Sequence, residues 1–404
     1  YGIRTENEST GTIQLEAGGN NTISFADGSG ISADSGVHIE LRATGDNFIT
    51  FEGSSTDHDG INAGSNNTGG IALQGTNNII KVQGNDSDGI YTDTGSENQT
   101  DLIAKGGSNT ITAGNNGIDH RGSGNVKLQA NNGSNKIFAN VGDGIRIQGD
   151  GTATVTGQTN KIEVIDDGLY IHKGSGDMAD ITLTATGSDA KGIGNYIDGN
   201  NGIHTAGENK GNITVTANGG KNVIHGTQNA VYNSGSGTIN IIASANSTGE
   251  GISLLADYIK YDNVLTAGGN GVKSDNTGIT NVIADNDNII AGTTNGILSN
   301  DSGTINVTAG NNNIIGQYRD ENNNIVTSMN GIKIDSGKVD IRAKNENIVA
   351  ASRHGIRVLG ENSKLILQGI TNRITTRNEN FDKHVDGIYV GNHGEAVVDG
   401  KETY

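Results

Sequence analysis

The 404-residue sequence contains no cysteine, no proline and no tryptophan, and only two methionines. The lack of cysteine excludes a disulfide scaffold. A formal net charge of −18 leaves little general attraction for nucleic acid, so we expect no nucleic-acid partner. No apolar run is long enough for a membrane-spanning helix or a secretory signal segment, and we expect no direct membrane insertion. Because the chain starts at Tyr1 and not at methionine, we expect a fragment of a longer protein, with the signal peptide absent.

The sequence contains a repeat instead. Only 32% of the residues are hydrophobic and 64 are glycine, a composition that would suggest disorder if it had no period. A Gly-Ile element, with occasional replacements, recurs every 20 to 35 residues, which indicates about 14 repeat units. Its apolar residues are Ile3, Ile31, Ile61, Ile90, Ile118, Ile145, Leu169, Ile203, Val231, Ile252, Val272, Ile297, Ile332, Ile356 and Ile388.

Each unit contains two further apolar runs between polar, glycine-rich corners. The second run alternates strictly, as in the TINVTAG of residues 304–310, and a period of two predicts a strand. One unit cannot bury enough apolar surface to fold alone, so the units must stack. The coils are too long and irregular for the left-handed hexapeptide helix. The sequence therefore predicts an all-β fold, a single domain over residues 1–404 that forms a right-handed parallel β-helix of about 14 coils with three short parallel sheets.

The third run begins with asparagine, as Asn-x-Ile. A side-chain amide carries both a donor and an acceptor, so stacked amides can bond in an unbroken column, and we predict a structural Asn ladder. Its members are Asn21, Asn47, Asn78, Asn109, Asn135, Asn160, Asn195, Asn222, Asn263, Asn288, Asn313, Asn347 and Asn372. The residue before each Gly-Ile is mostly Asp or Asn, and we expect its side chain to lie in solvent.

Some β-helices are pectinolytic enzymes that use clustered carboxylates near a His, Arg or Lys. The fragments of this kind are Asp166-Asp167, Arg353-His354 and Lys333. His354 lies seven coils from Asp167, about 34 Å along the axis, so the two cannot act on one bond. We therefore predict no catalytic residues and no enzyme.

Two acidic turns contain oxygen ligands of the kind that bind Ca²⁺, TDHDG at residues 56–60 and ADNDN at residues 284–288. Neither has the spacing of a known calcium loop, so we expect acidic turns, no metal site and no cofactor. Four polar residues fall on the inward side of the first run, where we expect interior, hydrogen-bonded side chains: His120, Asn233, Ser274 and Ser299.

The residue directly after each Gly-Ile points outward and forms what we call the outward column. It holds four of the ten tyrosines, and five Lys or Arg against one acid. Rings and cations together suit sugars or a protein partner, although exposed strand positions also favour Tyr by propensity. The column consists of Arg4, Ser32, Asn62, Tyr91, Asp119, Arg146, Tyr170, His204, Tyr232, Ser253, Lys273, Leu298, Lys333, Arg357 and Tyr389. A second candidate site is the long corner at residues 316–329, with Tyr318 and Arg319; residues 376–386 extend the same corner two coils later.

An acidic chain without cysteine or proline, with NGI, GTINVTAG and GNNNI repeats, resembles the passenger domains of classical (type V) autotransporter adhesins of Gram-negative bacteria. The likeness is one of repeat pattern along the whole chain, and no functional motif transfers residue by residue. The missing GDSG motif argues against the protease-bearing branch.

The resemblance implies a β-helix exported through a C-terminal barrel that this sequence lacks, and placed on the outer surface of the cell or secreted. It implies adhesion, autoaggregation or biofilm formation, with a host or bacterial surface glycan or protein, or a second copy, as partner. Two alternatives stay open: a carbohydrate-active β-helix enzyme (a polysaccharide lyase or tailspike-like hydrolase), and a structural spacer for a distal adhesive domain.

Overall fold

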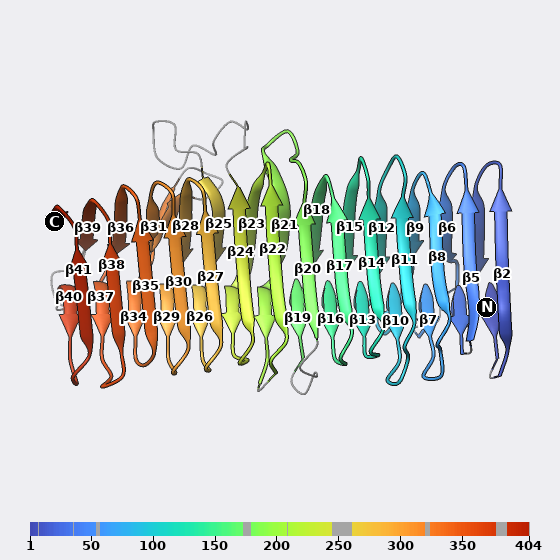
Figure 1. The fold of residues 1–404 in the computed structure, drawn as a ribbon, viewed down its shortest axis with the longest axis horizontal. Helices are drawn as coiled ribbons and strands as arrows, with labels where there is room; N and C mark the ends of the chain where they lie inside the picture. The colour runs from blue at the N-terminus through green and yellow to red at the C-terminus, as the bar shows by residue number, and fades with distance from the viewer. Residues whose placement is uncertain are drawn as a thin grey trace. The chain divides into compact units, whose positions relative to one another are not determined.

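The computed structural model describes residues 1–404 except 7, 35, 54–56, 173–178, 208, 245–260, 320–323, 377–385 and 404. Its internal contacts divide the chain into two compact units. The first comprises Tyr1–Gly187 with Asn209–Ile213, and the second comprises Ser188–Glu208 with Thr214–Tyr404. Throughout the described residues both units are built from β-strands and turns, without a helix (Figure 1).

The first unit has three strands in nearly every coil, one on each of three faces. The first face contains β1 (Ile3–Thr5), β4 (Ile31–Ala33), β7 (Ile61–Ala63), β10 (Ile90–Thr92), β13 (Ile118–His120), β16 (Ile145–Ile147) and β19 (Leu169–Ile171). The second contains β2 (Thr10–Ala17), β5 (Gly36–Ala43), β8 (Gly70–Gly75), β11 (Gln99–Ala104), β14 (Asn125–Ala130), β17 (Thr152–Gly157) and β20 (Asp180–Ala185). The third contains β3 (Asn21–Phe25), β6 (Asn47–Phe51), β9 (Asn78–Lys81), β12 (Asn109–Ala113), β15 (Ser134–Ala139) and β18 (Thr159–Val164).

The second unit repeats this order, but β21 (Ile193–Thr205) and β23 (Lys221–Asn233) run through the third and first faces without a break. The third face continues with β25 (Tyr261–Ala267), β28 (Asp287–Gly292), β31 (Asn313–Ile315), β36 (Glu346–Ala351), β39 (Thr371–Thr376) and β42 (Glu402–Thr403). The first continues with β26 (Asn270–Ser274), β29 (Asn295–Ser299), β34 (Asn330–Ile334), β37 (His354–Val358) and β40 (Asp386–Val390). The second contains β22 (Asn212–Asn218), whose first residues belong to the first unit, and β24 (Thr238–Ser244), β27 (Ile279–Ala284), β30 (Thr304–Ala309), β35 (Lys338–Ala343), β38 (Lys364–Gln368) and β41 (Glu395–Asp399).

The strands of each face pair in parallel with their equivalents in adjacent coils, as predicted. In Figure 1 the chain of each unit rises through the second-face strands and descends behind them while it advances, the right-handed sense. The predicted three sheets reduce to two, because the long strands join the first and third faces. Val231 pairs directly with Val272, so the solenoid has about 13 turns, one fewer than predicted. Ile252 and Ser253 lie outside the described residues.

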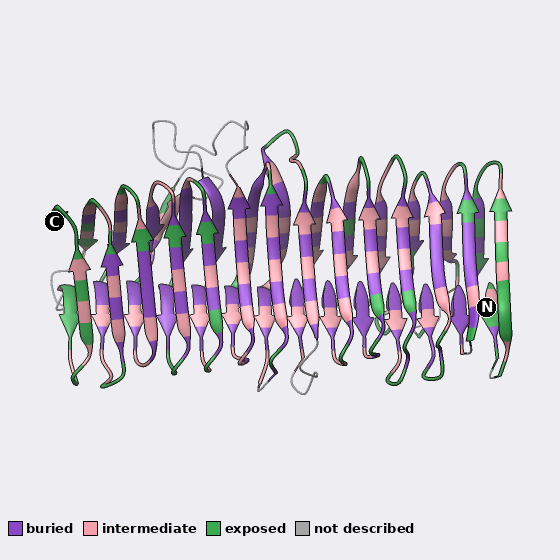
Figure 2. Ribbon diagram, in the orientation of Figure 1, coloured by how far each residue is buried: buried purple, intermediate pink, exposed green. Residues whose placement is uncertain are grey.

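Buried residues alternate with more exposed residues along most of the strands (Figure 2), and the buried residues include the aliphatic side chains that fill the interior. On the second face, Leu102, Leu128, Val155 and Leu183 stack in register on adjacent coils, and all are almost fully buried. Because each interior side chain meets its counterpart above and below, stacking supplies the burial that a single unit lacks.

The predicted Asn ladder is confirmed in both units. In the first unit, the Nδ2 atoms of Asn21, Asn47 and Asn78 each donate to the Oδ1 atom of the next ladder Asn, at 2.8–2.9 Å, and the chain of bonds continues to Asn160. In the second unit it runs from Asn195 to Asn372. Most of these amides give their second hydrogen to a carbonyl at the end of a second-face strand, so the ladder also ties two faces together.

The prediction that the residue before Gly-Ile lies in solvent is wrong. These side chains are buried, except that of Asn270, which is partly exposed, and they form a second column, here called the corner ladder: Asp59, Asp88, Asn116, Asp143 and Asp167 in the first unit, and Asn201, Asn229, Asn270, Asn295 and Asn330 in the second. The long strand β21 explains the burial, because a period of two carried from Asn195 through Ile197 to Asn201 keeps all three side chains inward.

The corner that carries Tyr318 and Arg319 folds back as an antiparallel hairpin of β32 (Gln317–Arg319) and β33 (Ile325–Thr327). Tyr318 packs against an apolar cluster of Tyr261, Val264, Ile289 and Ile314 on the third face. The hairpin therefore covers part of the outer surface of that face.

Candidate functional site

The outward column forms as predicted, because strand pairing sets its members directly beside one another. In the first unit it runs from Arg4 through Tyr91 and Arg146 to Tyr170. In the second it runs His204, Tyr232, Lys273, Leu298, Lys333, Arg357 and Tyr389. Leu298 and Asp119 are buried within the column.

Three column residues of the second unit form one cluster of rings and charge. The rings of His204 and Tyr232 stack with centroids 4.7 Å apart and planes 10° from parallel. The Nζ atom of Lys273 lies 4.3 Å from the Tyr232 ring centroid, a cation–π contact. The Tyr232 hydroxyl donates to Asp275 at 2.9 Å, and Lys273 pairs with the same carboxylate at 2.6 Å. Each side chain is thus held by at least one neighbour, while all three column residues remain partly exposed.

Cations also lie over aromatic rings in the first unit. The guanidinium carbon of Arg121 lies 5.0 Å from the Tyr91 ring centroid, and Arg121 pairs with the buried Asp119 at 2.7 Å. The corresponding carbon of Arg146 lies 5.8 Å from the Tyr170 ring. Burial, above all, raises the pKa of Tyr91 and Tyr170 to about 12. Both hydroxyls therefore stay protonated at neutral pH and can donate hydrogen bonds.

The outward column carries less net positive charge in the structure than its own residues suggest, because carboxylates outside the column lie beside its cations. Four of its five cations lie within 4 Å of a carboxylate oxygen outside the column, on Glu6, Asp143, Asp275 and Asp335. Arg357 has no ion pair in the described part of the chain. The column is therefore an arrangement of rings and paired charges, which suits hydrogen bonding and stacking better than long-range attraction of an anion.

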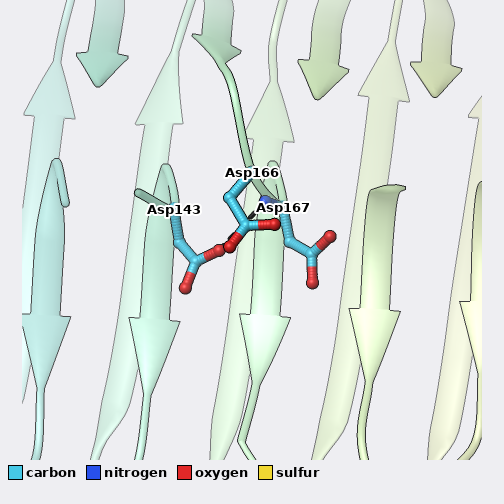
Figure 3. A group of neighbouring side chains, drawn as sticks. All are labelled: Asp143, Asp166 and Asp167. Atoms are coloured by element: carbon cyan, nitrogen blue, oxygen red, sulfur yellow. Dashed lines mark hydrogen bonds between the residues drawn. The ribbon is translucent and has the colours of Figure 1, made fainter. Parts of the chain in front are cut away.

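Three carboxylates converge on adjacent coils of the first unit (Figure 3). Each of Asp143, Asp166 and Asp167 offers an oxygen, and the three oxygens lie within 4.8 Å of one another. Asp166 is exposed, whereas Asp143 and Asp167 are buried in the corner ladder, where the backbone N–H of Asp167 donates to Oδ1 of Asp143 at 2.9 Å. The Nε atom of Arg146 lies 3.9 Å from Asp143. Burial, with the charge of Asp167 added, raises the pKa of Asp143 to about 8.

This cluster has the donor set for a divalent cation or for acid and base catalysis. However, the side chains of Asp143 and Asp167 are buried in the corner ladder, whereas a catalytic carboxylate must reach the substrate within hydrogen-bonding distance. The backbone bond between adjacent coils accounts for the burial of Asp143 and Asp167 without a ligand.

The other residues considered as candidates for catalysis or calcium binding do not lie together in the structure. Lys333 pairs with Asp335 at 2.5 Å. His354 faces Asp386 at 3.4 Å, and burial, followed by the charges of Arg353 and Arg357, lowers the pKa of His354. In the two acidic turns, Asp59 belongs to the corner ladder and Asp287 accepts bonds from Asn311 and Asn312. These carboxylates thus serve the backbone of neighbouring coils.

The four polar residues of the inward side are interior, as predicted. His120 bonds the Thr92 hydroxyl and, at 2.7 Å, the carbonyl of Gly124, and burial lowers the pKa of His120. Asn233 accepts from Thr205 at 2.7 Å, and Ser299 donates to the Ser336 carbonyl at 2.7 Å. Ser274 is buried too, but its Oγ atom has no hydrogen-bond partner in the described residues.

One surface feature was not predicted from the sequence. A groove of about 830 Å³ runs across the ends of β27, β30, β35, β38 and β41 in the second unit. Its lining includes the cations Arg342, Lys344 and Lys401 and the acids Asp285 and Asp399. Only the alignment of five coils brings these residues together, since each coil contributes a short segment that looks like an ordinary corner.

The described part of the chain has no helix long and apolar enough to cross a membrane. Comparisons with protein-family models, with curated proteins and with solved structures found no match for this chain. The arguments on function therefore rest on the repeat pattern, the column, the groove and the carboxylates.

Proposed function

We propose that the chain is the passenger domain of a bacterial surface adhesin, a binding module without catalytic activity. It mediates adhesion to a host or bacterial surface glycan or protein, autoaggregation or biofilm formation, on the outside of a Gram-negative cell or after secretion. The repeat pattern supports the proposal because it carries the likeness to autotransporter passengers, and the stacked coils support it because a β-helix is the fold that this likeness implies.

The cluster of His204, Tyr232 and Lys273 carries the proposal. The three side chains lie on adjacent strands of one face, are partly exposed, and are fixed by stacking, a cation–π contact and a shared carboxylate. Rings held in place before binding offer contact area at a low cost in conformational entropy. A partner that stacks on these rings and bonds their polar edges would recognise the column as it stands.

A carbohydrate-active enzyme is the second candidate, and the cluster of Asp143, Asp166 and Asp167 is the observation that favours it. If this cluster hydrolysed or eliminated glycosidic bonds, Asp166→Asn would abolish the release of reducing ends or unsaturated products from polysaccharides. We favour binding, because only Asp166 of the three is exposed. A structural spacer would be expected to show no binding by the isolated chain.

The test combines a glycan array with a cell-aggregation assay. One variant carries Arg146, Tyr170, Tyr232 and Lys273 all changed to Ser; the control carries Lys127→Ser and Tyr196→Ser, which remove a Lys and a Tyr outside the column. We expect the column variant to lose binding at an unchanged melting temperature and the control to bind as the wild type does. Equal binding by all three proteins would exclude the column as the site.

A further inference from the structure

A small residue lies in the middle of each segment that lines the groove of the second unit. On the five coils this residue is Ala or Gly: Ala284, Ala309, Ala343, Gly369 and Gly400. A Cβ atom at Gly400 would lie 2.6 Å from Nδ2 of Asn372, and one at Gly369 would lie 2.8 Å from Nδ2 of Asn347. The Asn ladder therefore leaves no room for larger side chains at these two positions.

The same ladder holds the wall of the groove in place. The amides of Asn263, Asn288 and Asn313 donate to the carbonyls of Ile283, Thr308 and Arg342 at 2.8–2.9 Å. Asn347 and Asn372 do the same to Gln368 and Asp399. All five acceptors line the groove, so every coil that forms it is held by a partly buried hydrogen bond to the Asn ladder. A groove fixed in this way requires little ordering when a ligand enters.

The charges of the groove favour an anionic ligand. The three central coils contribute Arg342 and Lys344 and no acid, whereas the acids Asp285 and Asp399 lie on the two outermost coils. Lys344 and Lys401 are exposed and form no ion pair in the described part of the chain. Arg342 bonds Asp340 at 2.8 and 3.1 Å and Gln368 at 3.1 Å.

The surrounding sequence has the same bias. Residues 333–404 contain 11 Lys and Arg against 10 Asp and Glu, a formal charge of +1, whereas residues 1–332 contain 16 against 35, a formal charge of −19. Three of the five coils of the groove, those of β35, β38 and β41, thus lie in the segment of the chain that repels an anion least.

We propose that this groove binds an extended acidic polysaccharide that lies along the solenoid axis and has its carboxylate or sulfate groups on Lys344, Arg342 and Lys401. Five coils span about 19 Å from the first to the last, at about 4.8 Å per coil. A sugar unit of an extended polysaccharide advances by a similar distance, so successive sugars meet equivalent positions on successive coils. Ile283 and Ile370 are exposed on the lining and offer apolar contact to sugar rings. The inference rests on the proposal that the chain is a binding module, but it concerns a surface separate from the outward column.

The groove binds without cleaving. Its two acids, Asp285 and Asp399, lie four coils apart, about 19 Å at about 4.8 Å per coil. The carboxyl pairs of glycosidases are about 5–10 Å apart, so these two cannot act on one glycosidic bond.

The test measures binding of the 404-residue chain to polygalacturonate by biolayer interferometry at low and high salt. The groove variant carries Lys344→Gln and Lys401→Gln. The control carries Lys105→Gln and Lys127→Gln in the first unit, where Lys105 follows Ala104 at the end of β11 as Lys344 follows Ala343 at the end of β35. All four lysines lie outside the interior, so the variants should fold, and melting followed by circular dichroism checks this. We expect the groove variant to bind about tenfold more weakly, the control to bind as the wild type does, and salt to weaken binding.

Further probes separate this ligand from other occupants. Neutral dextran and monomeric galacturonate at equal sugar concentration should bind much more weakly than polygalacturonate. Tighter binding of polyglutamate would overturn the proposal in favour of an acidic peptide, and loss of self-association in the groove variant alone, without an effect on polygalacturonate, would identify a second copy as the occupant. Equal polygalacturonate binding by the groove variant refutes the groove while adhesion through the outward column stands. Absence of every interaction on arrays and cells would refute the proposed function itself.

Discussion

Asp88→Asn should stabilise the first unit at neutral pH and reduce the pH dependence of its stability. Asp88 is buried in the corner ladder, and its Oδ1 atom accepts hydrogen bonds from the backbone and the side chain of Asn116 at 2.9 and 3.0 Å. Burial, followed by the charges of Asp59 and Asp119, raises its pKa from 3.8 to about 7. The second unit has Asn at the described positions of its corner ladder that precede His354, and the amides of Asn229, Asn270, Asn295 and Asn330 each donate to the amide of the previous coil.

The direction in which pH changes the stability contributed by Asp88 follows from proton linkage. Between pH 4 and 7 the unfolded chain has already released the Asp88 proton while the folded chain holds it. The stability that this group contributes is therefore full below pH 4 and falls by about 1.4 kcal/mol per pH unit until the pKa of the folded state is passed. Above that pH the buried charge costs about 4 kcal/mol. An amide keeps the acceptor and can donate to Asp59 as Asn116 donates to Asp88, so the variant should recover most of this cost, about 2–4 kcal/mol at pH 8.

Urea unfolding followed by circular dichroism at several pH values measures the effect, and Asp86→Asn is the matched control. Asp86 is exposed two residues away, so the control removes one negative charge and leaves the corner ladder intact. We expect a higher midpoint at pH 8 and a shallower pH dependence for Asp88→Asn alone. An unchanged midpoint, or an equal gain in the control, would show that the buried carboxylate carries no electrostatic cost.

Three further substitutions test the structural account, two by urea unfolding and the third by amide exchange. Asn288→Ala removes a buried amide that bonds Asn263, Asn313 and the Thr308 carbonyl, and it should cost about 2–5 kcal/mol; a loss below 1 kcal/mol would mean that the Asn ladder contributes little. Gly310→Ala places a Cβ atom 1.8 Å from the Asp285 carbonyl oxygen and should destabilise by about 1–3 kcal/mol, whereas Gly106→Ala, with nothing within 4 Å, should be close to neutral. Tyr318→Ser removes the ring that packs on Tyr261 and Val264 and should speed amide exchange in β32 and β33; unchanged exchange would mean that other contacts hold the hairpin.

The sequence was sufficient to predict the parallel coils, the Asn ladder and the outward column, because these features repeat with the same residue type at the same place in each unit. Asn109 and Asn135, for example, differ in their neighbours but share a position two residues before a buried Ile. The prediction that the side chains before each Gly-Ile are exposed was wrong. Asp and Asn are common at solvent-exposed turns, but they also form hydrogen bonds in stacked columns, and the residue type alone does not distinguish the two. The period of two from Asn195 to Asn201 was the signal that could have shown the burial.

Features that depend on contacts between coils could not be predicted from the sequence. The coil count was one too high because Gly-Ile alone was taken as a coil, although the unit from Val231 to Ile252 lacked a ladder Asn. Glu6, Asp275 and Asp335 each pair with the column cation two residues earlier, a spacing that the sequence does contain. Nothing in the repeat pattern indicated that Lys344 and Lys401 would line one groove, because that arrangement follows from the register of neighbouring coils.

Saturable binding of the purified chain to intact cells is the measurement that tests the central claim most directly. The account predicts binding that saturates, that a glycan or a second copy of the chain competes for, and that falls sharply when Arg146, Tyr170, Tyr232 and Lys273 are changed to Ser. A chain that binds no cell surface, or a column variant that binds as the wild type does, would contradict it.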